Sequence, residues 1–267
     1  SDIFFVFSKF SAENEIKNLS DSKYYIISGL PRDYSVSPLK PMAQDLRNSL
    51  YENGVTKIVS IFDENSSDDS RWHTGHELQK ENYEYIIDEL FRDKTLGIIF
   101  KPKAMGRLKI RLGETYDRIQ EAIKTRRCIF LDDKIFHPVT KPAVLAGLAS
   151  DLSIHGHLSA GTAAIECAAA GIPVIMIDRE GCPYSKLSQL PKGKLVHENW
   201  ESTIQFIRNY EIDQKNEIIK EWSFIIDEID PFRDGLASSR ISDYLGWILE
   251  GYRDFQKSDQ ILMNVAE

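Results

Sequence analysis

The chain contains 267 residues, a length that suits one large domain or two small ones and allows a substantial hydrophobic core. Lys and Arg number 33 against 41 Asp and Glu, and the resulting net charge of -8 repels nucleic acid, so no nucleic-acid partner is expected. Hydrophobic residues at 42% and charged residues at 28% exclude an intrinsically disordered chain.

Cysteines and apolar runs restrict the protein class further. Cys128, Cys167 and Cys182 are too few and too far apart for a disulfide framework, and no C-x-x-C pair indicates zinc or redox chemistry. The longest apolar run, 167–177, contains Gly and Pro and falls short of the roughly 20 residues that a membrane-spanning helix needs. No initiator Met or signal peptide opens the chain. We therefore expect a cytoplasmic protein and a chain that is part of a longer one.

Strand and helix patterns alternate along most of the chain. Two aromatic-rich runs come first as candidate strands, at 4–7 and 24–27, and a helix is expected over 41–52. Further strands are predicted at 57–62, 96–100, 127–131, 152–155, 172–177 and 194–196. Helices are predicted at 77–92, 113–124, 141–149, 159–170 and 200–208. This alternation predicts an α/β fold, a Rossmann-like doubly wound parallel sheet of about six strands.

Helix-boundary residues support parts of this assignment. Thr140 before Lys141-Pro142 is a candidate N-cap with proline in the first turn, and Gly171 is a candidate left-handed stop for the helix at 159–170. Two long C-terminal helices are expected at 211–229 and 235–255, on either side of Asp230-Pro231. Their tryptophans, Trp222 and Trp247, are expected in the core.

The strand order places a candidate ligand site. In open α/β sheets, ligands bind beyond the carboxyl ends of the strands, where the strand order reverses. With the common order 3-2-1-4-5-6, the loop at 63–66 faces the loop at 155–159. Both loops are polar, so we expect the ligand at this junction.

The junction from 154 to 162 passes from a buried strand into a helix of small residues. Backbone amides near Ser159 and Thr162 suit an anion, since the first amides of a helix have no intrahelical acceptor. Gly156 and Gly161 allow a phosphate to approach closely. Glu166, one turn beyond Thr162, suits the two hydroxyls of a ribose.

Other motifs and packing give competing interpretations of this segment. Gly156 and Gly161 have the outer spacing of a P-loop, but Thr162 stands where the lysine is required. His155 and His157 could form half of a metal site, but no third ligand is placed beside them. His76-Glu77 lacks the second histidine of a metalloprotease helix. The simplest alternative is tight helix-sheet packing through small residues.

The segments 151–156, 159–162 and 166–175 together resemble the donor-binding half of GT-B glycosyltransferases. The turn Gly29-Leu30-Pro31-Arg32-Asp33 is similar to one in bacterial surface-polysaccharide transferases and polyglycerol-phosphate polymerases. Non-hydrolysing UDP-N-acetylglucosamine 2-epimerases share the architecture and a similar helix start. The resemblance therefore implies a nucleotide-activated donor and leaves the base and the sugar open.

The resemblance also implies roles for individual residues. Ser159, Gly161 and Thr162 would hold the phosphates, Glu166 the ribose, and the segment 134–137 the base. Lys101 and Lys103 would bring positive charge to the leaving phosphate, where charge builds during transfer. No metal or other cofactor is then required. The predicted catalytic residues are Lys103 and His137, and the predicted donor-binding residues are Lys101, Phe136, His155, Gly156, Ser159, Ala160, Gly161, Thr162 and Glu166.

These residues also have structural interpretations. A lysine at a strand end is often only solvated, His137 beside Pro138 could cap the next helix, and Arg32 with Asp33 could form a structural turn. The arginines and the aspartate at 233–240 are expected to organise the start of the last helix.

These inferences predict a glycosyltransferase of the bacterial surface or capsular polysaccharide type that transfers a sugar from a nucleotide-sugar to a glycan or glycolipid acceptor. Residues 1–54 would be a connector and remnant of the acceptor half, 55–210 the donor-binding domain, and 211–267 helices that pack back on the cleft. Such an enzyme would work at the inner face of the membrane, with peripheral association through a missing N-terminal half. The alternatives are a sugar-nucleotide epimerase, a CDP-glycerol-type glycerophosphotransferase and a noncatalytic scaffold.

Overall fold

The computed structural model describes residues 2–64, 66–68, 75–103, 107–131, 141–181, 185–254 and 257–266. Two compact units make up the chain. One unit is Leu39–Trp222, and the other combines Ser1–Pro38 with Ser223–Glu267. The sequence predicts a donor-binding domain at 55–210 and a remnant of the acceptor half at 1–54. These roles stay predictions, because the division into compact units does not show which substrate a segment binds.

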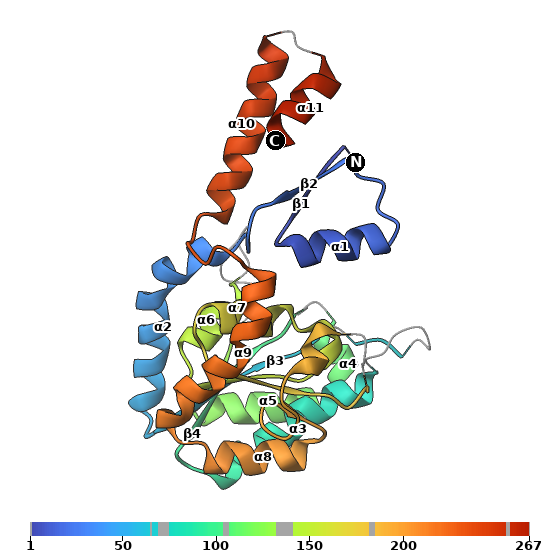
Figure 1. Ribbon diagram of the computed structural model, residues 1–267. Coiled ribbons are helices and arrows are strands. Elements are labelled where there is room, and N and C mark those ends of the chain that lie inside the picture. The colour runs from blue at the N-terminus through green and yellow to red at the C-terminus, as the bar shows by residue number, and fades with distance from the viewer. Residues whose placement is uncertain are drawn as a thin grey trace. The chain divides into compact units, whose positions relative to one another are not determined.

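The larger unit is built on a parallel six-stranded sheet with the order β5-β4-β3-β6-β7-β8 (Figure 1). The strands are β3 (Lys57–Phe62), β4 (Leu96–Lys101), β5 (Cys128–Phe130), β6 (Leu152–His155), β7 (Val174–Ile177) and β8 (Val196–His197). In chain order this is 3-2-1-4-5-6, so the predicted fold class and strand order are confirmed. The order reverses between β3 and β6, which pair in parallel from Val59 opposite Leu152 to Phe62 opposite His155.

The central strands are buried on both faces, as their nearly uninterrupted apolar sequences require. β6 and β7 are buried at every position, and β3 and β4 at all but one. Among the buried polar residues are Ser60 on β3, Ser153 on β6 and Ser150 just before β6, and their hydroxyls bond one another at 2.8 to 3.4 Å. Buried hydroxyls are tolerated there because each finds a partner.

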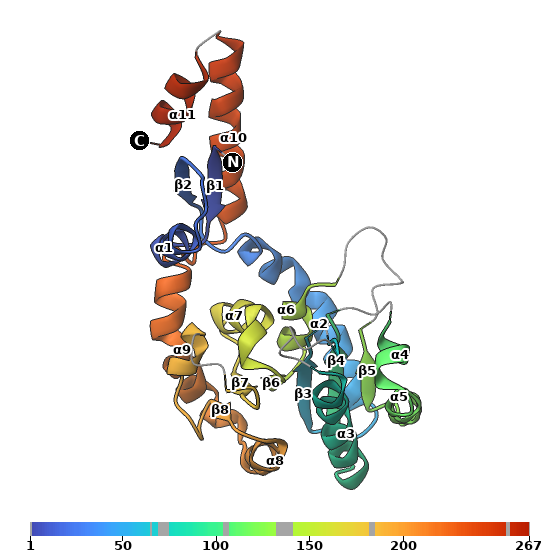
Figure 2. The ribbon, with the colours of Figure 1, turned by 90° about the vertical axis from the view of Figure 1, so that its right-hand side faces the viewer.

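Helices cover both faces of the sheet (Figure 2). One layer contains α3, α4, α5 and α8, and the opposite layer contains α6 and α7. The bounds are α3 (His76–Arg92), α4 (Leu108–Leu112), α5 (Thr115–Lys124), α6 (Ala143–Leu148), α7 (Thr162–Ala169) and α8 (Trp200–Asn209). The short 3-10 helices are η1 (Asp33–Ser35), η3 (Leu158–Ala160), η4 (Lys186–Gln189) and η5 (Ile212–Gln214).

Two helix starts differ from the predictions. α2 (Val36–Tyr51) begins before the predicted start and carries Pro41 inside it, where the proline nitrogen has no hydrogen to donate to the preceding turn. α6 begins at Ala143 with Pro142 at the N-cap position, so the prediction of a helix capped by Thr140 with Pro142 in its first turn was wrong. Thr140 itself lies outside the described residues. The stop at Gly171 is confirmed, with φ +73° in the left-handed region that glycine adopts easily.

The smaller unit contains a two-stranded parallel sheet of β1 (Ile3–Val6) and β2 (Tyr24–Ile27), with α1 (Lys9–Lys17), α10 (Ala237–Arg253) and α11 (Ser258–Ala266). α9 (Lys215–Ile229) crosses from the larger unit into it. Trp222 on α9 is buried and donates to the Val174 carbonyl at 2.8 Å, as the core prediction requires. Trp247 on α10 is 52% exposed, so its core prediction was wrong, because the helix period cannot tell which face finds a partner.

The turn after β2 packs against the start of α10 within the smaller unit. Gly29, with φ +89°, brings the chain so close to Asp230 that an added Cβ would lie 3.2 Å from its carboxylate. Ser238 donates to the Pro31 carbonyl at 2.9 Å, and Arg240 donates to the Ser28 carbonyl at 3.2 Å. The turn at 29–33 and the segment at 233–240, both singled out in the sequence, therefore have a structural role in the smaller unit.

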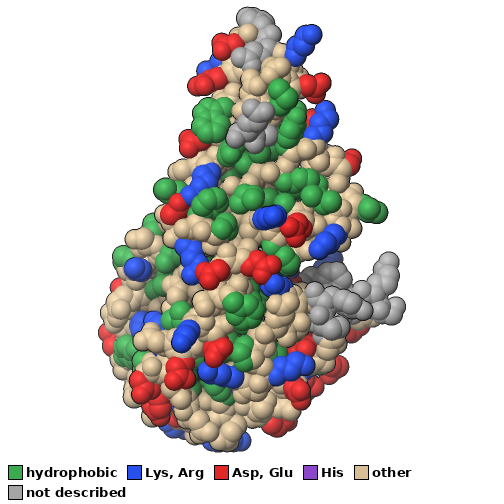
Figure 3. All heavy atoms as spheres, in the orientation of Figure 1, with side chains coloured by type: hydrophobic (Ala, Val, Ile, Leu, Met, Phe, Trp, Pro, Cys, Tyr) green, Lys and Arg blue, Asp and Glu red, His purple; other side chains and the backbone are tan. Residues whose placement is uncertain are grey.

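The surface mixes both signs of charge. Figure 3 shows acidic and basic side chains interspersed on one face, with apolar side chains between them. Among the helices of the described ranges, none combines the length and the apolarity that crossing a bilayer demands.

Candidate functional site

The predicted junction exists at the carboxyl edge of β3 and β6. The Gly156 amide donates to the Phe62 carbonyl at 3.1 Å, which holds the start of the β6–α7 loop against the end of β3. Asp63 and Glu64 follow β3, and Lys103 follows the neighbouring β4. The two loops thus lie at the reversal of strand order, where open α/β sheets bind ligands.

Asp63 links three elements at this edge. Its Oδ2 accepts from the Tyr83 hydroxyl at 2.6 Å and from Gln79 Nε2 at 3.0 Å, both on α3, and its Oδ1 accepts from the Lys103 amide at 2.7 Å. Burial raises the pKa of Asp63, although these hydrogen bonds oppose the shift. A carboxylate with three donors holds β3, β4 and α3 together, so Asp63 is a structural anchor.

Lys103 lies beside the buried Glu64. The Lys103 ammonium forms an ion pair with the Glu64 carboxylate, and 59% of the lysine side chain remains exposed. The Glu64 carbonyl also accepts from Gln79 Nε2 at 2.8 Å. The predicted cation is therefore present at the carboxyl edge, and a ligand phosphate would compete with Glu64 for it.

Asn82 on α3 has an orientation fixed by its neighbours. Arg179 and Trp200 can only donate, and they do so to Asn82 Oδ1 at 2.6 and 3.0 Å. The amide nitrogen must therefore donate to His157 Nε2, 2.8 Å away. With Nε2 accepting, the His157 proton sits on Nδ1 and points to Glu180 Oε1 at 2.5 Å.

Glu180 ends this directed chain of hydrogen bonds. It accepts from His157 and, at 3.2 Å, from the Ser159 hydroxyl. The His157 side chain is 0% exposed and the Glu180 side chain 4% exposed. Since both ring nitrogens of His157 are occupied inside the core, the His157–Glu180 pair fixes the β6–α7 and β7–η4 loops.

His155 is also buried. Its Nδ1 accepts from the His157 amide at 3.3 Å, and burial together with the nearby His157 lowers the pKa of His155 to about 3. A metal site on the two histidines would need the nitrogens of His157 that Asn82 and Glu180 occupy. Within the described ranges, no group of three or more His, Cys, Asp and Glu side chains has an arrangement that could hold a metal ion.

The two glycines predicted at the phosphate site make close contacts with protein. A Cβ at Gly156 would lie 2.5 Å from Asn82 Nδ2, and a Cβ at Gly161 would lie 2.1 Å from Leu187 Cδ1. Their lack of a side chain is therefore required by packing on α3 and η4. The Gly156 amide is itself used within the fold, because it donates to the Phe62 carbonyl at 3.1 Å.

The start of α7 has an exposed residue, Thr162. The structure splits the predicted helix at 159–170 into η3, which contains Ser159 and Ala160, and α7, which begins at Thr162 without a side-chain cap. Thr162 is exposed and Glu166, one turn later, is half-buried. Ser159 lies outside α7 and commits its proton to Glu180, so the predicted shared helical face is reduced to Thr162 and Glu166.

The remaining predicted residues fall into two groups. Lys101 at the end of β4 is half-buried, and its ammonium donates to the Pro102 carbonyl at 3.0 Å. Phe136 and His137 lie outside the described residues, as does the side chain of Ala160. The structure thus brings Lys101 and Lys103 to the same sheet edge as His155, Gly156 and the α7 start.

Sequence reasoning missed the polar residues that build this edge. Gln79, Asn82 and Tyr83 lie on the buried face of α3, and Arg179 with Glu180 follow β7. The available signal was amide side chains at 79 and 82 on the same helical stripe as the apolar Ile86 and Leu90. Buried amides imply hydrogen-bond partners, though the stripe does not identify them.

No family profile and no curated protein sequence matches this chain. Solved structures do match. A variant of the wall teichoic acid polymerase TagF superimposes with a TM-score of 0.61 at 13% identity, covering 95% of this chain and 59% of that structure. The fold is GT-B-like.

Two other structures give the same result. A Listeria monocytogenes protein assigned as a UDP-N-acetylglucosamine 2-epimerase has a TM-score of 0.54 at 14% identity, covering 97% of this chain and 61% of that one. HepE from Anabaena, in complex with UDP and glucose, has a TM-score of 0.50 at 16% identity, covering 92% and 63%. The chain thus spans about three fifths of the length of these structures, and at these identities the likeness shows the fold.

Proposed function

We propose that this chain binds a nucleotide-sugar at the carboxyl edge of β3, β6 and β7 and supplies the donor-binding part of a glycosyltransferase. One observation carries the proposal. α7 starts uncapped at the reversal of strand order, with an exposed Thr162 and with Glu166 one turn behind it. A helix start at this place offers amides and a positive dipole end to a phosphate.

Each predicted residue has a physical task in this proposal. The α7 amides and the Thr162 hydroxyl hold the diphosphate, and Glu166 accepts from the ribose hydroxyls. Lys103 leaves Glu64 to neutralise the departing phosphate, with Lys101 adding charge at the same edge. His155, Gly156, Ser159, Ala160 and Gly161 shape the loop beneath the phosphate, while Phe136 and His137 meet the base and the reacting sugar. No metal or other cofactor is assigned to the site.

The acceptor side is proposed to lie outside this chain, because the chain spans 59% of the TagF structure that it matches. A surface glycan or glycolipid is the proposed acceptor, and a location at the inner face of the membrane goes with it. We assign this chain to donor binding and leave the acceptor-side base to the remaining part of such an enzyme.

Two neighbouring activities have specific support. The likeness to the wall teichoic acid polymerase TagF, one structure of which was obtained after a soak with CDPG, favours transfer of a glycerophosphoryl unit from CDP-glycerol. The likeness to the Listeria protein favours epimerisation of the nucleotide-sugar itself. Product analysis separates them: transfer needs an acceptor and releases a nucleotide, whereas epimerisation changes the donor with no acceptor present.

Ligand binding is the first test. In a thermal-shift series with UDP, CDP, CMP, GDP and ADP, a nucleotide at about 100 times its dissociation constant should raise the melting temperature by roughly 5 to 10 °C. Glu166→Ala should abolish most of that shift. Glu52→Ala, an exposed glutamate at the end of α2, is the matched control and should keep it. The proposal fails if calorimetry detects no nucleotide, or if Glu166→Ala binds as the parent does.

A further inference from the structure

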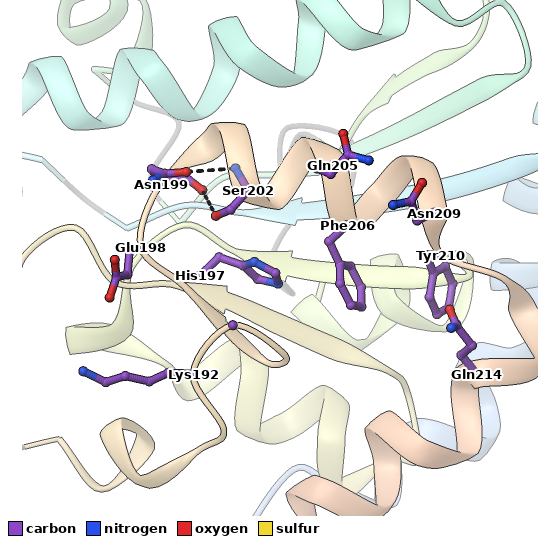
Figure 4. A pocket seen from close by; sticks show the side chains of 11 residues that line it. Lys192, His197, Glu198, Asn199, Ser202, Gln205, Phe206, Asn209, Tyr210 and Gln214 are labelled. Carbon is purple, nitrogen blue, oxygen red and sulfur yellow. Dashed lines mark hydrogen bonds between the residues drawn. The ribbon is translucent and has the colours of Figure 1, made fainter.

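A groove lies along the β8 edge of the sheet, apart from the start of α7. It has a volume of about 660 Å³ and lies between the loop before β8, the helix α8 and the 3-10 helix η5. Figure 4 shows its lining residues, with the rings of His197, Phe206 and Tyr210 in a row and polar side chains around them. All of these residues belong to the larger unit.

The floor of the groove is aromatic. His197 on β8 meets Phe206 edge-on with ring centroids 5.1 Å apart, and Phe206 stacks on Tyr210 with centroids 6.0 Å apart. His197 and Tyr210 are buried, whereas Phe206 is partly exposed. Phe206 therefore presents part of its ring surface to the groove.

His197 carries a buried nitrogen that lacks a hydrogen-bond partner. Its Nε2 has none, while the ring donates to the Lys194 backbone carbonyl, which leaves Nδ1 as the donor. Burial lowers the pKa of His197, so the ring is neutral near pH 7 and Nε2 offers a lone pair. A buried acceptor without a donor is costly, which makes Nε2 a natural place for a ligand hydroxyl.

The rim is polar and carries balanced charge. Gln205, Asn209 and Gln214 supply exposed amides, which both donate and accept. Lys192 and Glu198 lie together at the end of the groove far from Gln214, and their charges are opposite (Figure 4). The charges of Lys192 and Glu198 therefore offset each other along the lining of the groove.

We propose that this groove binds a neutral saccharide, with a sugar ring packed on Phe206 and a hydroxyl donating to His197 Nε2. A saccharide combines apolar C–H faces, which suit an aromatic surface, with hydroxyls that suit amides and an unpartnered acceptor. This site is separate from the proposed nucleotide site and does not depend on it.

The test uses maltotriose, chitotriose and mannotriose as probes, with the full chain. At least one should bind with 1:1 stoichiometry in calorimetry and shift the His197 Nε2 signal in histidine-selected ¹⁵N NMR spectra. His197→Phe keeps a ring and removes the acceptor, and it should weaken binding by about tenfold or more without lowering the unfolding midpoint. Phe206→Ala should weaken binding by at least about tenfold as well.

Controls separate this site from the nucleotide site. Phe224→Ala, at an aromatic residue that is 43% exposed elsewhere in the chain, should keep the parent affinity for the saccharide. Glu166→Ala should keep it too. The inference is overturned if none of the three probes shifts the His197 signal, if His197→Phe binds them as tightly as the parent, or if UDP shifts that signal.

Discussion

The carboxyl edge of β3 and β6 and the groove along β8 treat buried polar groups in opposite ways. At the edge, Asn82 and His157 belong to a series of hydrogen bonds in which each donor has an acceptor. In the groove, His197 Nε2 is buried without a partner. A satisfied polar group specifies one packing of the fold, whereas an unsatisfied one carries a cost that a ligand can remove. The same side-chain type thus serves structure in one place and suits recognition in the other.

The largest effect on stability is expected from removing the hydrogen bonds of Asn82. Asn82→Leu would leave Trp200 Nε1 and His157 Nε2 buried without partners and should lower the free energy of unfolding by about 3 to 5 kcal/mol. Urea denaturation followed by circular dichroism measures this. Asn48→Leu, at an exposed position on α2, is the control and should change stability little. If Asn82→Leu lost no more stability than the control, the hydrogen bonds of Asn82 would not be needed to stabilise the fold.

Lowering the pH should reduce the stability of the protein through the buried His155 at the same edge. The pKa of His155 is about 3 in the folded protein against a usual value of 6.5, so the unfolded state takes up a proton that the folded state excludes. Stability is therefore present above pH 6.5 and lost as the pH falls toward 3, by about 2 kcal/mol between pH 7 and 5 from this residue alone. Denaturation curves at several pH values should show a shallower slope for His155→Phe. Equal slopes would contradict the assignment.

A glycine pair tests the closeness of packing. Gly156→Ala would push a Cβ to 2.5 Å from Asn82 and should cost about 1 to 3 kcal/mol. Gly246→Ala, within α10 and with no atom within 4 Å of an added Cβ, should instead stabilise by about 0.5 to 1 kcal/mol. Melting curves of the two variants should therefore shift in opposite directions. Shifts of the same sign would contradict the tight contact at Gly156.

The change in stability expected from the groove variant is also small, and its sign is the informative part. His197→Phe removes the unpartnered nitrogen and should raise the free energy of unfolding by about 1 kcal/mol, although the hydrogen bond to Lys194 is lost. Chemical denaturation of the ligand-free protein measures it. A loss comparable to that of Asn82→Leu would remove the contrast between the two regions.

Much of the architecture could be predicted from the sequence because its signals are local. The strand at 57–62 is a run of β-branched and aromatic residues, and Gly171 marks a helix end through its left-handed backbone. The strand order followed from the commonest doubly wound topology. Trp247 shows the limit: its spacing fitted a core position, but exposure depends on what packs against α10.

The candidate site was predicted only in part, because its construction depends on distant residues. The α7 start was recognised from small residues and glycines in sequence. Asn82 lies 75 positions before His157, and no local pattern indicates that the two would be hydrogen-bonded. Ser159 is an example. Its hydroxyl bonds Glu180, which lies 21 positions later in the chain, and Ser159 therefore does not share a helical face with Glu166 as predicted.

The seam between β3 and β6 also bears on how the protein folds. β3, β4 and β5 are consecutive in the chain, as are β6, β7 and β8, so each trio can assemble through crossovers of moderate length. Joining the trios closes a loop that separates Ile58 from Asp151 by 93 positions. Such a distant pairing raises the contact order and slows folding, so β3 and β6 should pair late. The edge at which we expect the ligand would then be absent from early folding intermediates.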